Sequence, residues 1–326
     1  MKIDSIEQLN IELAGGCNLA CPMCPQSSGR EKEFLGNLPF DIFKKAIDEA
    51  LPLGLKYVNL GGSGEPLLYN QLNEVVSYLS QNNLVSLIYT NGIWLTPEKF
   101  EQLCQAGLSA AKVSCQGWDR ESYAKWMSTD KYDEVRGNLK KCSAILKNNS
   151  QYTTFLQTNH LIHDYDKLEY QKECYINNWI KYLDVGGEIW MTHNWSGQYD
   201  AIPRHEIYET RKKRSCGRPL ANVLEIRAGG LDKKRGAVVP CPNVLGQDSK
   251  AVMGHLQDMS LIDVATSEKF QHLRTVHIKK QFDEIDYCRD CDQLIESPEA
   301  LVWTNIDNRQ YGESRISNIH YVEMAD

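Results

Sequence analysis

The chain has 326 residues, of which 42% are hydrophobic, and a formal net charge of −7. This length fits one large α/β domain, or a domain of roughly 200 residues followed by a smaller one. Acidic and basic residues are interspersed without a basic block, and no apolar run is long enough to cross a bilayer. We therefore expect neither a nucleic-acid nor a membrane partner. The polar N-terminus does not read as a signal peptide, which predicts a cytoplasmic protein.

Short apolar segments alternate with amphipathic ones over the first part of the chain. Strands are predicted at 6–14, 56–62, 84–92, 110–117, 152–162 and 182–193. Helices are predicted between them at 39–51, 71–81, 96–107, 132–148 and 168–178. Repeated strand–helix units form parallel sheets, and six of them fit a partial (β/α)6 TIM-like barrel of the α/β class.

The C-terminal part has a different pattern. Residues 223–241 contain two apolar alternating runs around a glycine- and lysine-rich turn, which predicts a β-hairpin. A helical stretch at 260–278 follows, and the tail at 300–326 is left open between a strand and a partner-binding segment. We therefore predict a barrel domain at 1–205 and a small α+β domain at 206–326.

Three of the eleven cysteines, Cys17, Cys21 and Cys24, lie in one short segment after the first predicted strand. Thiols stay reduced in the cytosol, so this grouping favours metal binding over a disulfide. Three ligands are one too few for a structural zinc site. A [4Fe–4S] cluster takes one protein ligand per iron, so three cysteines would leave one iron open for chemistry.

This C-x3-C-x2-C segment resembles the signature of the radical S-adenosylmethionine (radical SAM) superfamily. Motifs similar to others of the family follow at the ends of the next strands: Gly61, Gly62, Gly64, Glu65 and Pro66 after the second, Thr90 and Asn91 after the third, and Ser114 after the fourth. Gln157 and Asn159 on the fifth strand are further candidates. The sequence departs from the family pattern at Met23, where an aromatic residue is usual, and at Gln116, where Asp is frequent.

The resemblance implies a function for these residues. The three cysteines would hold a [4Fe–4S] cluster that binds SAM, and the glycine-rich loop with its carboxylate would take the methionine ammonium group. One electron would then cleave SAM to methionine and a 5′-deoxyadenosyl radical, which abstracts a hydrogen atom from a substrate. A flavodoxin or a ferredoxin is the expected electron donor.

A second set of cysteines, Cys216, Cys241, Cys288 and Cys291, lies in the C-terminal part. Their spacing is compatible with zinc or with an iron–sulfur cluster. The segment that begins at Gly236 and the terminal C-x2-C resemble the SPASM extension of radical SAM enzymes. No cysteine follows Cys291, so the resemblance implies the shortened twitch form with one auxiliary [4Fe–4S] cluster, similar to that of a dehydrogenase that acts on aminocyclitols.

Several other residues have more than one interpretation. Cys115, after the fourth strand, is either a packed thiol or a hydrogen-atom donor to a substrate radical. At the end of the sixth strand, His193 is a candidate base and Asn194 and Trp195 are candidate substrate contacts, with capping or packing as the alternative. The remaining histidines show no ligand spacing and are assigned to the core or surface: His160, His163, His205, His255, His272, His277 and His320.

These observations lead to a ranked set of hypotheses. The first is a two-electron oxidation of a small polar molecule, such as a sugar or an aminocyclitol, with the auxiliary cluster as the electron acceptor. The alternatives are a radical SAM epimerase with a cysteine donor, a peptide-modifying maturase and, last, a non-catalytic iron–sulfur or zinc scaffold. A peptide therefore stays possible as the substrate.

Overall fold

A single ten-stranded sheet organises the molecule, in the order β10-β6-β5-β4-β3-β2-β1-β7-β8-β9. The computed structural model describes residues 5–24, 26, 36–196, 215–229, 234–244, 250–294 and 301–306. The strands are β1 (Gln8–Ile11), β2 (Tyr57–Leu60), β3 (Val85–Thr90), β4 (Ala110–Ser114), β5 (Phe155–Ile162), β6 (Gly186–Met191), β7 (Val223–Gly229), β8 (Arg235–Val239), β9 (Gly254–His255) and β10 (Leu301–Thr304). Strands β1 to β6 pair in parallel, which confirms the predicted α/β partial barrel.

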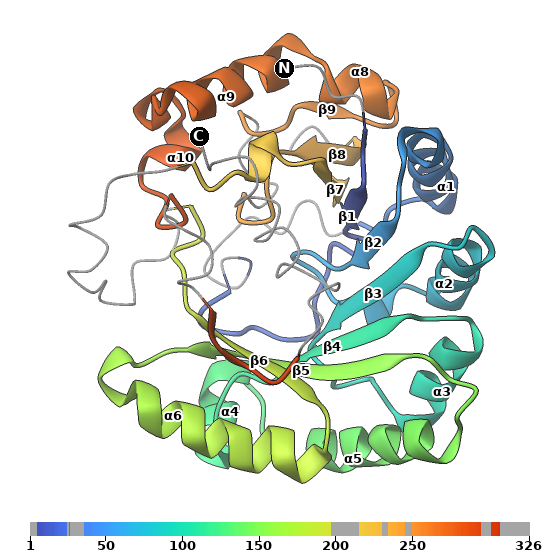
Figure 1. Ribbon diagram of the computed structural model, residues 1–326, viewed down its shortest axis with the longest axis vertical. Coiled ribbons are helices and arrows are strands. Elements are labelled where there is room, and N and C mark those ends of the chain that lie inside the picture. Colours follow the sequence, from blue (N-terminus) through green and yellow to red (C-terminus); the bar gives the residue numbers. More distant parts are fainter. Residues whose placement is uncertain are drawn as a thin grey trace.

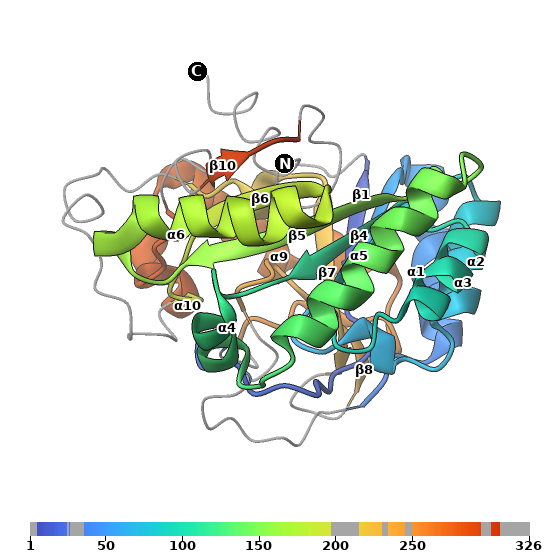
Figure 2. The ribbon, with the colours of Figure 1, turned by 90° about the horizontal axis from the view of Figure 1, so that it is seen from below.

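The helices that connect the parallel strands cover the outer side of the arc that the sheet forms (Figure 1). The helices of the chain are α1 (Phe40–Ala50), α2 (Leu72–Gln81), α3 (Pro97–Gln105), α4 (Arg120–Met127), α5 (Tyr132–Asn148), α6 (Leu168–Tyr175), α8 (Leu261–Ala265), α9 (Glu268–Lys279) and α10 (Asp286–Arg289). Figure 2 shows α5 and α6 lying across the strands that they connect. Among the described residues, no helix is both long and apolar enough to cross a membrane.

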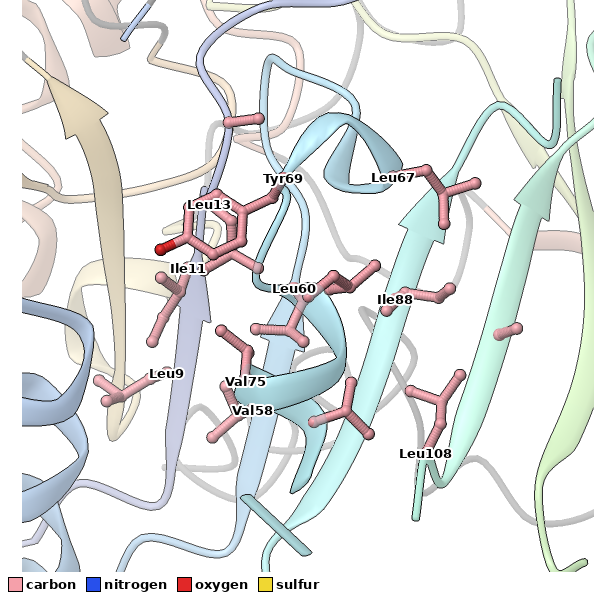
Figure 3. Packing of buried hydrophobic residues seen from close by; sticks show 14 of the residues in the cluster. Leu9, Ile11, Leu13, Val58, Leu60, Leu67, Tyr69, Val75, Ile88 and Leu108 are labelled. Atoms are coloured by element: carbon pink, nitrogen blue, oxygen red, sulfur yellow. The ribbon is translucent and has the colours of Figure 1, made fainter. Parts of the chain in front are cut away.

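The core lies between these helices and the outer face of the sheet. Figure 3 shows Leu9, Val58 and Ile88 on neighbouring strands, with Val75 of α2 packed beside Val58. All four side chains are fully buried. Because side chains alternate across a strand, the residues between these apolar ones point to the opposite, inner face of the arc. On β1 the inward residues are polar, which leaves hydrogen-bonding groups inside the barrel.

The helix starts follow local capping rules. The Thr96 hydroxyl accepts a hydrogen bond from the Lys99 backbone N–H and begins α3, as the sequence predicts. The sequence reasoning missed α4, although Asp119 and Ser122 form a reciprocal capping box there. Because α4 is only eight residues long and half of its residues are charged or polar, it has too little apolar periodicity to be recognised by pattern.

The predicted hairpin is confirmed as β7 and β8, which pair antiparallel. Its position was not predicted: β7 pairs in parallel with β1, so the hairpin extends the barrel sheet. At the other edge, β10 pairs antiparallel with β6 and uses part of the tail that was left open. The predicted boundary between residues 205 and 206 lies outside the described residues.

Candidate functional site

The loop after β1 carries the first three cysteines. The pKa of Cys21 is raised to about 12, chiefly by burial and in smaller part by the neighbouring Cys24 and Cys17. Burial likewise raises the pKa of Cys17, with contributions from Glu65 and Cys24. The three thiols therefore lie close enough for their charges to interact, and a bound cationic iron group would favour their thiolate forms.

The donor set fits a [4Fe–4S] cluster. Such a cluster binds each thiolate through a different iron, so three cysteines would hold three of its irons and leave the fourth open. Cys17, Cys21 and Cys24 would hold such a cluster.

The glycine-rich loop after β2 contacts the residues just before Cys17 in the cysteine loop. The Glu65 N–H donates a hydrogen bond of 2.8 Å to the Gly16 carbonyl. A Cβ atom at Gly64 would overlap the carbonyl oxygen of Ala14, so this close approach requires glycine. The structure thus brings together two of the motifs that the sequence predicts to share one site.

Glu65 connects this loop to the end of β3. Its carboxylate is only 2% exposed and accepts hydrogen bonds from the Thr90 hydroxyl (2.6 Å) and the Asn91 N–H (2.8 Å). It also accepts one from the Leu67 N–H (3.1 Å), in the turn that begins at Pro66. Glu65 therefore positions the Thr90–Asn91 turn, and its contact with a SAM ammonium group stays a prediction.

Asn91 connects the turn after β3 to the cysteine loop. Its amide Nδ2 lies 2.7 Å from Asn18 Oδ1 and 3.7 Å from the sulfur of Cys17. The carboxyl ends of β1, β2 and β3 thus meet around the cysteine loop. Chemistry in α/β barrels is placed at this end of the strands.

The next two strands extend the inner surface. Ser114 and Asn159 are register partners on β4 and β5, and both are half-buried. Gln157 pairs with Lys112, further from the carboxyl ends of the strands, and is 1% exposed. Within the part of the chain that the structure describes, Gln157 Nε2 has no hydrogen-bond partner. The proposed contacts of Ser114, Gln157 and Asn159 with SAM stay predictions.

A buried charge pair inside the barrel was missed by the sequence reasoning. Lys112 Nζ lies 2.5 Å from a Glu188 carboxylate oxygen, and both side chains are 2% exposed. The Trp190 Nε1–H donates to the same carboxylate at 3.0 Å, and Lys112 lies 3.4 Å from the Tyr89 hydroxyl. The sequence did carry a signal for this pair, since a lysine and a glutamate each stand within an otherwise apolar predicted strand.

Cys115 lies in the hydrophobic core and is fully buried. Burial raises its pKa well above the usual range, and its charge would interact with Tyr123 and Tyr175. Its neighbours on the helix-covered side support the packing interpretation, and no described contact brings this thiol to the inner face.

The segment after β6 connects the barrel to the second cysteine set. The Asn194 N–H donates to the Asp292 carboxylate at 2.7 Å, and Asn194 Nδ2 donates to the Asp290 carbonyl at 2.6 Å. The rings of His193 and Trp195 are 4.2 Å apart, and His193 Nδ1 accepts the Trp195 N–H at 3.3 Å. These contacts give Asn194 a structural role, whereas substrate contact by His193 and Trp195 stays a prediction.

The four C-terminal cysteines line one pocket: Cys216, Cys241, Cys288 and Cys291. Burial raises the pKa of Cys241 to about 11, against a lowering by Arg218, which also lines the pocket. Burial also raises the pKa of Cys288 and Cys291, and both are raised further by the other cysteines of the set. Four converging thiols beside a guanidinium fit a cluster bound through four thiolates.

His277 also lines this pocket, although the sequence reasoning assigned it to the core or surface. Its Nε2 lies 3.6 Å from the sulfur of Cys288, and its Nδ1 lies 2.9 Å from the Ser215 hydroxyl. Burial lowers the pKa of His277 to about 4. No local motif indicated this contact, because His277 is eleven residues from Cys288 and on another helix.

A buried ion pair connects the two cysteine regions. The Arg227 guanidinium donates to a Glu12 carboxylate oxygen at 3.1 Å and to the Pro242 carbonyl, just after Cys241, at 2.6 Å. The same Glu12 oxygen accepts the Ser63 N–H of the glycine-rich loop at 2.6 Å. Arg227 and Glu12 thus join the glycine-rich loop to the loop that carries Cys241.

Family models match both regions. The radical SAM superfamily model matches residues 11–170, and an iron–sulfur cluster-binding domain model, SPASM, matches residues 233–292. The chain therefore contains a radical SAM domain followed by a SPASM domain. These domains imply SAM, a [4Fe–4S] cluster that binds it, and auxiliary iron–sulfur chemistry.

Three known proteins illustrate the similarity. The chain is 24% identical to the tungsten-containing aldehyde ferredoxin oxidoreductase cofactor-modifying protein of Pyrococcus furiosus, over 92% of each chain. The structure of BtrN in complex with AdoMet and 2-DOIA matches with a TM-score of 0.61 at 20% identity, covering 89% of this chain and 94% of BtrN. Streptococcus suis SuiB bound to precursor peptide SuiA matches with a TM-score of 0.63 at 14% identity, covering 89% and 70%. The two structural matches show a shared fold.

Proposed function

We propose that the protein is a radical SAM oxidoreductase that carries out a two-electron oxidation of a small polar molecule, such as a sugar or an aminocyclitol. The observation that carries this proposal is the presence of two separate thiol sites in one chain, the second with four converging cysteines. When bound, the SAM-binding cluster supplies a 5′-deoxyadenosyl radical and the auxiliary cluster supplies an electron acceptor.

The inner surface of the barrel supports a polar substrate. Lys112, Glu188 and Asn159 offer charged and neutral hydrogen-bonding groups in neighbouring positions on β4, β6 and β5. The Asn159 Oδ1 atom is buried and has no hydrogen-bond partner among the described residues. A buried polar atom without a partner costs free energy, which a ligand hydroxyl or amine would offset.

The chain's own residues have defined tasks in this proposal. Glu65 and Asn91 hold the turn beside Cys17 and keep the cofactor loops in register. Oxidation of a C–OH or C–NH2 group to the carbonyl or imine level releases a proton. His193, at the end of β6, is the proposed acceptor, and it takes the proton at Nδ1 once the hydrogen bond from the Trp195 N–H to that nitrogen opens.

A peptide substrate is the second candidate. SuiB, which shares the fold, was crystallised with a precursor peptide, whereas BtrN was crystallised with 2-DOIA. The Pyrococcus relative is named as a cofactor-modifying protein. Epimerisation with Cys115 as hydrogen donor is disfavoured by the burial of that thiol in the helix-side core.

Iron counting and 5′-deoxyadenosine formation test the proposal. We expect about eight irons per chain after anaerobic reconstitution and about four in a Cys17→Ala/Cys21→Ala/Cys24→Ala variant. The wild type should form 5′-deoxyadenosine from SAM with dithionite or reduced flavodoxin, and the triple variant should form none. About four irons in the wild type and none in the variant would remove the auxiliary cluster from the proposal.

Product analysis separates the reactions. Inositols, aminocyclitols and short peptides are supplied in turn, and 5′-deoxyadenosine formation above the uncoupled rate identifies the substrate class. An oxidised product without solvent deuterium is expected. Deuterium at an inverted carbon would instead establish an epimerase, and stimulation by peptides alone would establish a maturase.

A further inference from the structure

His277 is held in one orientation at the auxiliary pocket. It projects from α9, is 1% exposed, and stacks edge-on against Phe282 with ring centres 5.3 Å apart. Its two ring nitrogens face different partners, with Ser215 at Nδ1 and the sulfur of Cys288 at Nε2. His277 is the one imidazole among the described residues that line this pocket.

The hydrogen-bond chain selects the tautomer of this imidazole. The Gly217 N–H donates to the Ser215 hydroxyl oxygen at 3.0 Å, which occupies one lone pair of that oxygen. The hydroxyl proton is then free to point at His277 Nδ1, which leaves the ring proton on Nε2. A ring that carries its proton on Nε2 is a hydrogen-bond donor toward the sulfur of Cys288.

We propose that His277 is a positioning residue of the auxiliary site, which donates an Nε2–H hydrogen bond to the Cys288 thiolate and thereby raises the reduction potential of the cluster bound there. The inference rests on the proposed auxiliary cluster. It assigns this chain a means of tuning its electron acceptor that lies outside the cysteine motif.

The physical reason is electrostatic. Reduction adds negative charge to a cluster and its sulfur ligands, and an N–H dipole directed at a thiolate stabilises that charge. The Arg218 guanidinium lines the same pocket, and its positive charge acts in the same direction. His277 contacts a third proposed ligand, Cys288.

The test measures a potential in the full-length chain. The Cys17→Ala/Cys21→Ala/Cys24→Ala background leaves the auxiliary site as the sole predicted source of a cluster signal, and its midpoint potential is obtained from an anaerobic titration followed by electron paramagnetic resonance. His277→Leu removes the donor and should lower the potential by about 59 mV, which corresponds to a tenfold change in the one-electron equilibrium constant. His277→Gln restores a side-chain N–H and should recover part of the loss.

His272→Leu is the matched control, because His272 is an exposed imidazole on the same helix. The cluster in the His272→Leu variant should have the same midpoint potential as in the triple-cysteine background. In deuterated buffer, electron paramagnetic resonance of the reduced triple-cysteine variant should show coupling of the cluster to an exchangeable deuteron. The same variant with His277→Leu should lack this coupling. A His277→Leu potential equal to that of the control, with the iron content intact, would overturn the proposal.

Ser215→Ala provides a second route if His277→Leu loses iron. It keeps the imidazole and removes the hydroxyl that selects the tautomer, so a smaller fall in potential is expected, and an unchanged potential with the deuteron coupling also unchanged overturns the proposal. Absence of any cluster in the triple-cysteine background contradicts the proposed function itself and is recognised by its iron content near zero.

Discussion

Individual buried polar side chains decide much of the local structure of this protein. His160 is fully buried, accepts a hydrogen bond from the Gly117 N–H at 3.3 Å, and stacks on Tyr175 with ring centres 4.6 Å apart. Burial lowers its pKa to about 3. The residue was assigned to the core or surface from the sequence, and the structure places it in the interior.

This burial predicts a pH dependence of stability. The unfolded chain takes a proton at His160 below about pH 6.5, whereas the folded chain does not take it until about pH 3, so stability is lost as pH falls through this interval. Between pH 7.5 and 5.5, His160 should reduce the free energy of unfolding by about 1.4 kcal/mol, measured by anaerobic urea denaturation. His160→Asn keeps an acceptor for Gly117 and should show a correspondingly smaller loss. Equal losses in both proteins would contradict the assignment.

At the scale of elements, the loops at the carboxyl ends of β1, β2 and β3 form one unit. The glycine-rich loop contacts the cysteine loop through backbone atoms, and Glu65 fastens it to the turn after β3. The motifs were predictable from the sequence, since each is contiguous along the chain. The role of Glu65 as the connecting carboxylate was not, because its partners are 25 and 26 residues away.

Gly64→Ala tests this unit. The added Cβ would overlap the Ala14 carbonyl oxygen, so the two loops must separate. We expect SAM affinity to fall at least about tenfold and the free energy of unfolding to fall by about 2 kcal/mol, measured by equilibrium dialysis and by urea denaturation. Gly137→Ala is the control: it lies in α5 with open space around it and should stabilise the protein by about 0.5–1 kcal/mol. Unchanged SAM binding in Gly64→Ala would show that the close contact is dispensable.

At the scale of the whole molecule, C-terminal segments complete both edges of the barrel sheet. β7 joins the β1 edge and β10 joins the β6 edge. Asn194 then connects the end of β6 to the two residues that flank Cys291, through three hydrogen bonds with Asp290 and Asp292. The auxiliary pocket is therefore attached to the barrel from both sides.

Asn194→Ala should weaken this attachment. Loss of the side-chain hydrogen bonds leaves the Asp292 N–H and the Asp290 carbonyl without these partners, at a cost of about 1–3 kcal/mol. We expect faster release of auxiliary iron to a chelator, followed by absorbance, with the SAM-binding cluster unaffected. Asn178→Ala is the matched control, because it removes a hydrogen bond from an asparagine side-chain amide to the Trp118 carbonyl within the barrel. Equal iron release from both variants would contradict a specific role for Asn194.

The amino-acid sequence was sufficient for the features that are local along the chain. Alternating apolar segments predicted β1 to β6 and most of their helices, and close cysteine spacing predicted an iron–sulfur site, because periodicity and ligand spacing depend on neighbouring residues. Contacts between distant residues required the folded chain. Arg227 meets Glu12 across 215 positions, and Lys112 meets Glu188 across 76, because parallel pairing brings remote strands together and alternation turns their polar side chains inward. His277 lies beside Cys288 for a different reason, because the packing of two helices, and no sequence motif, brings them together.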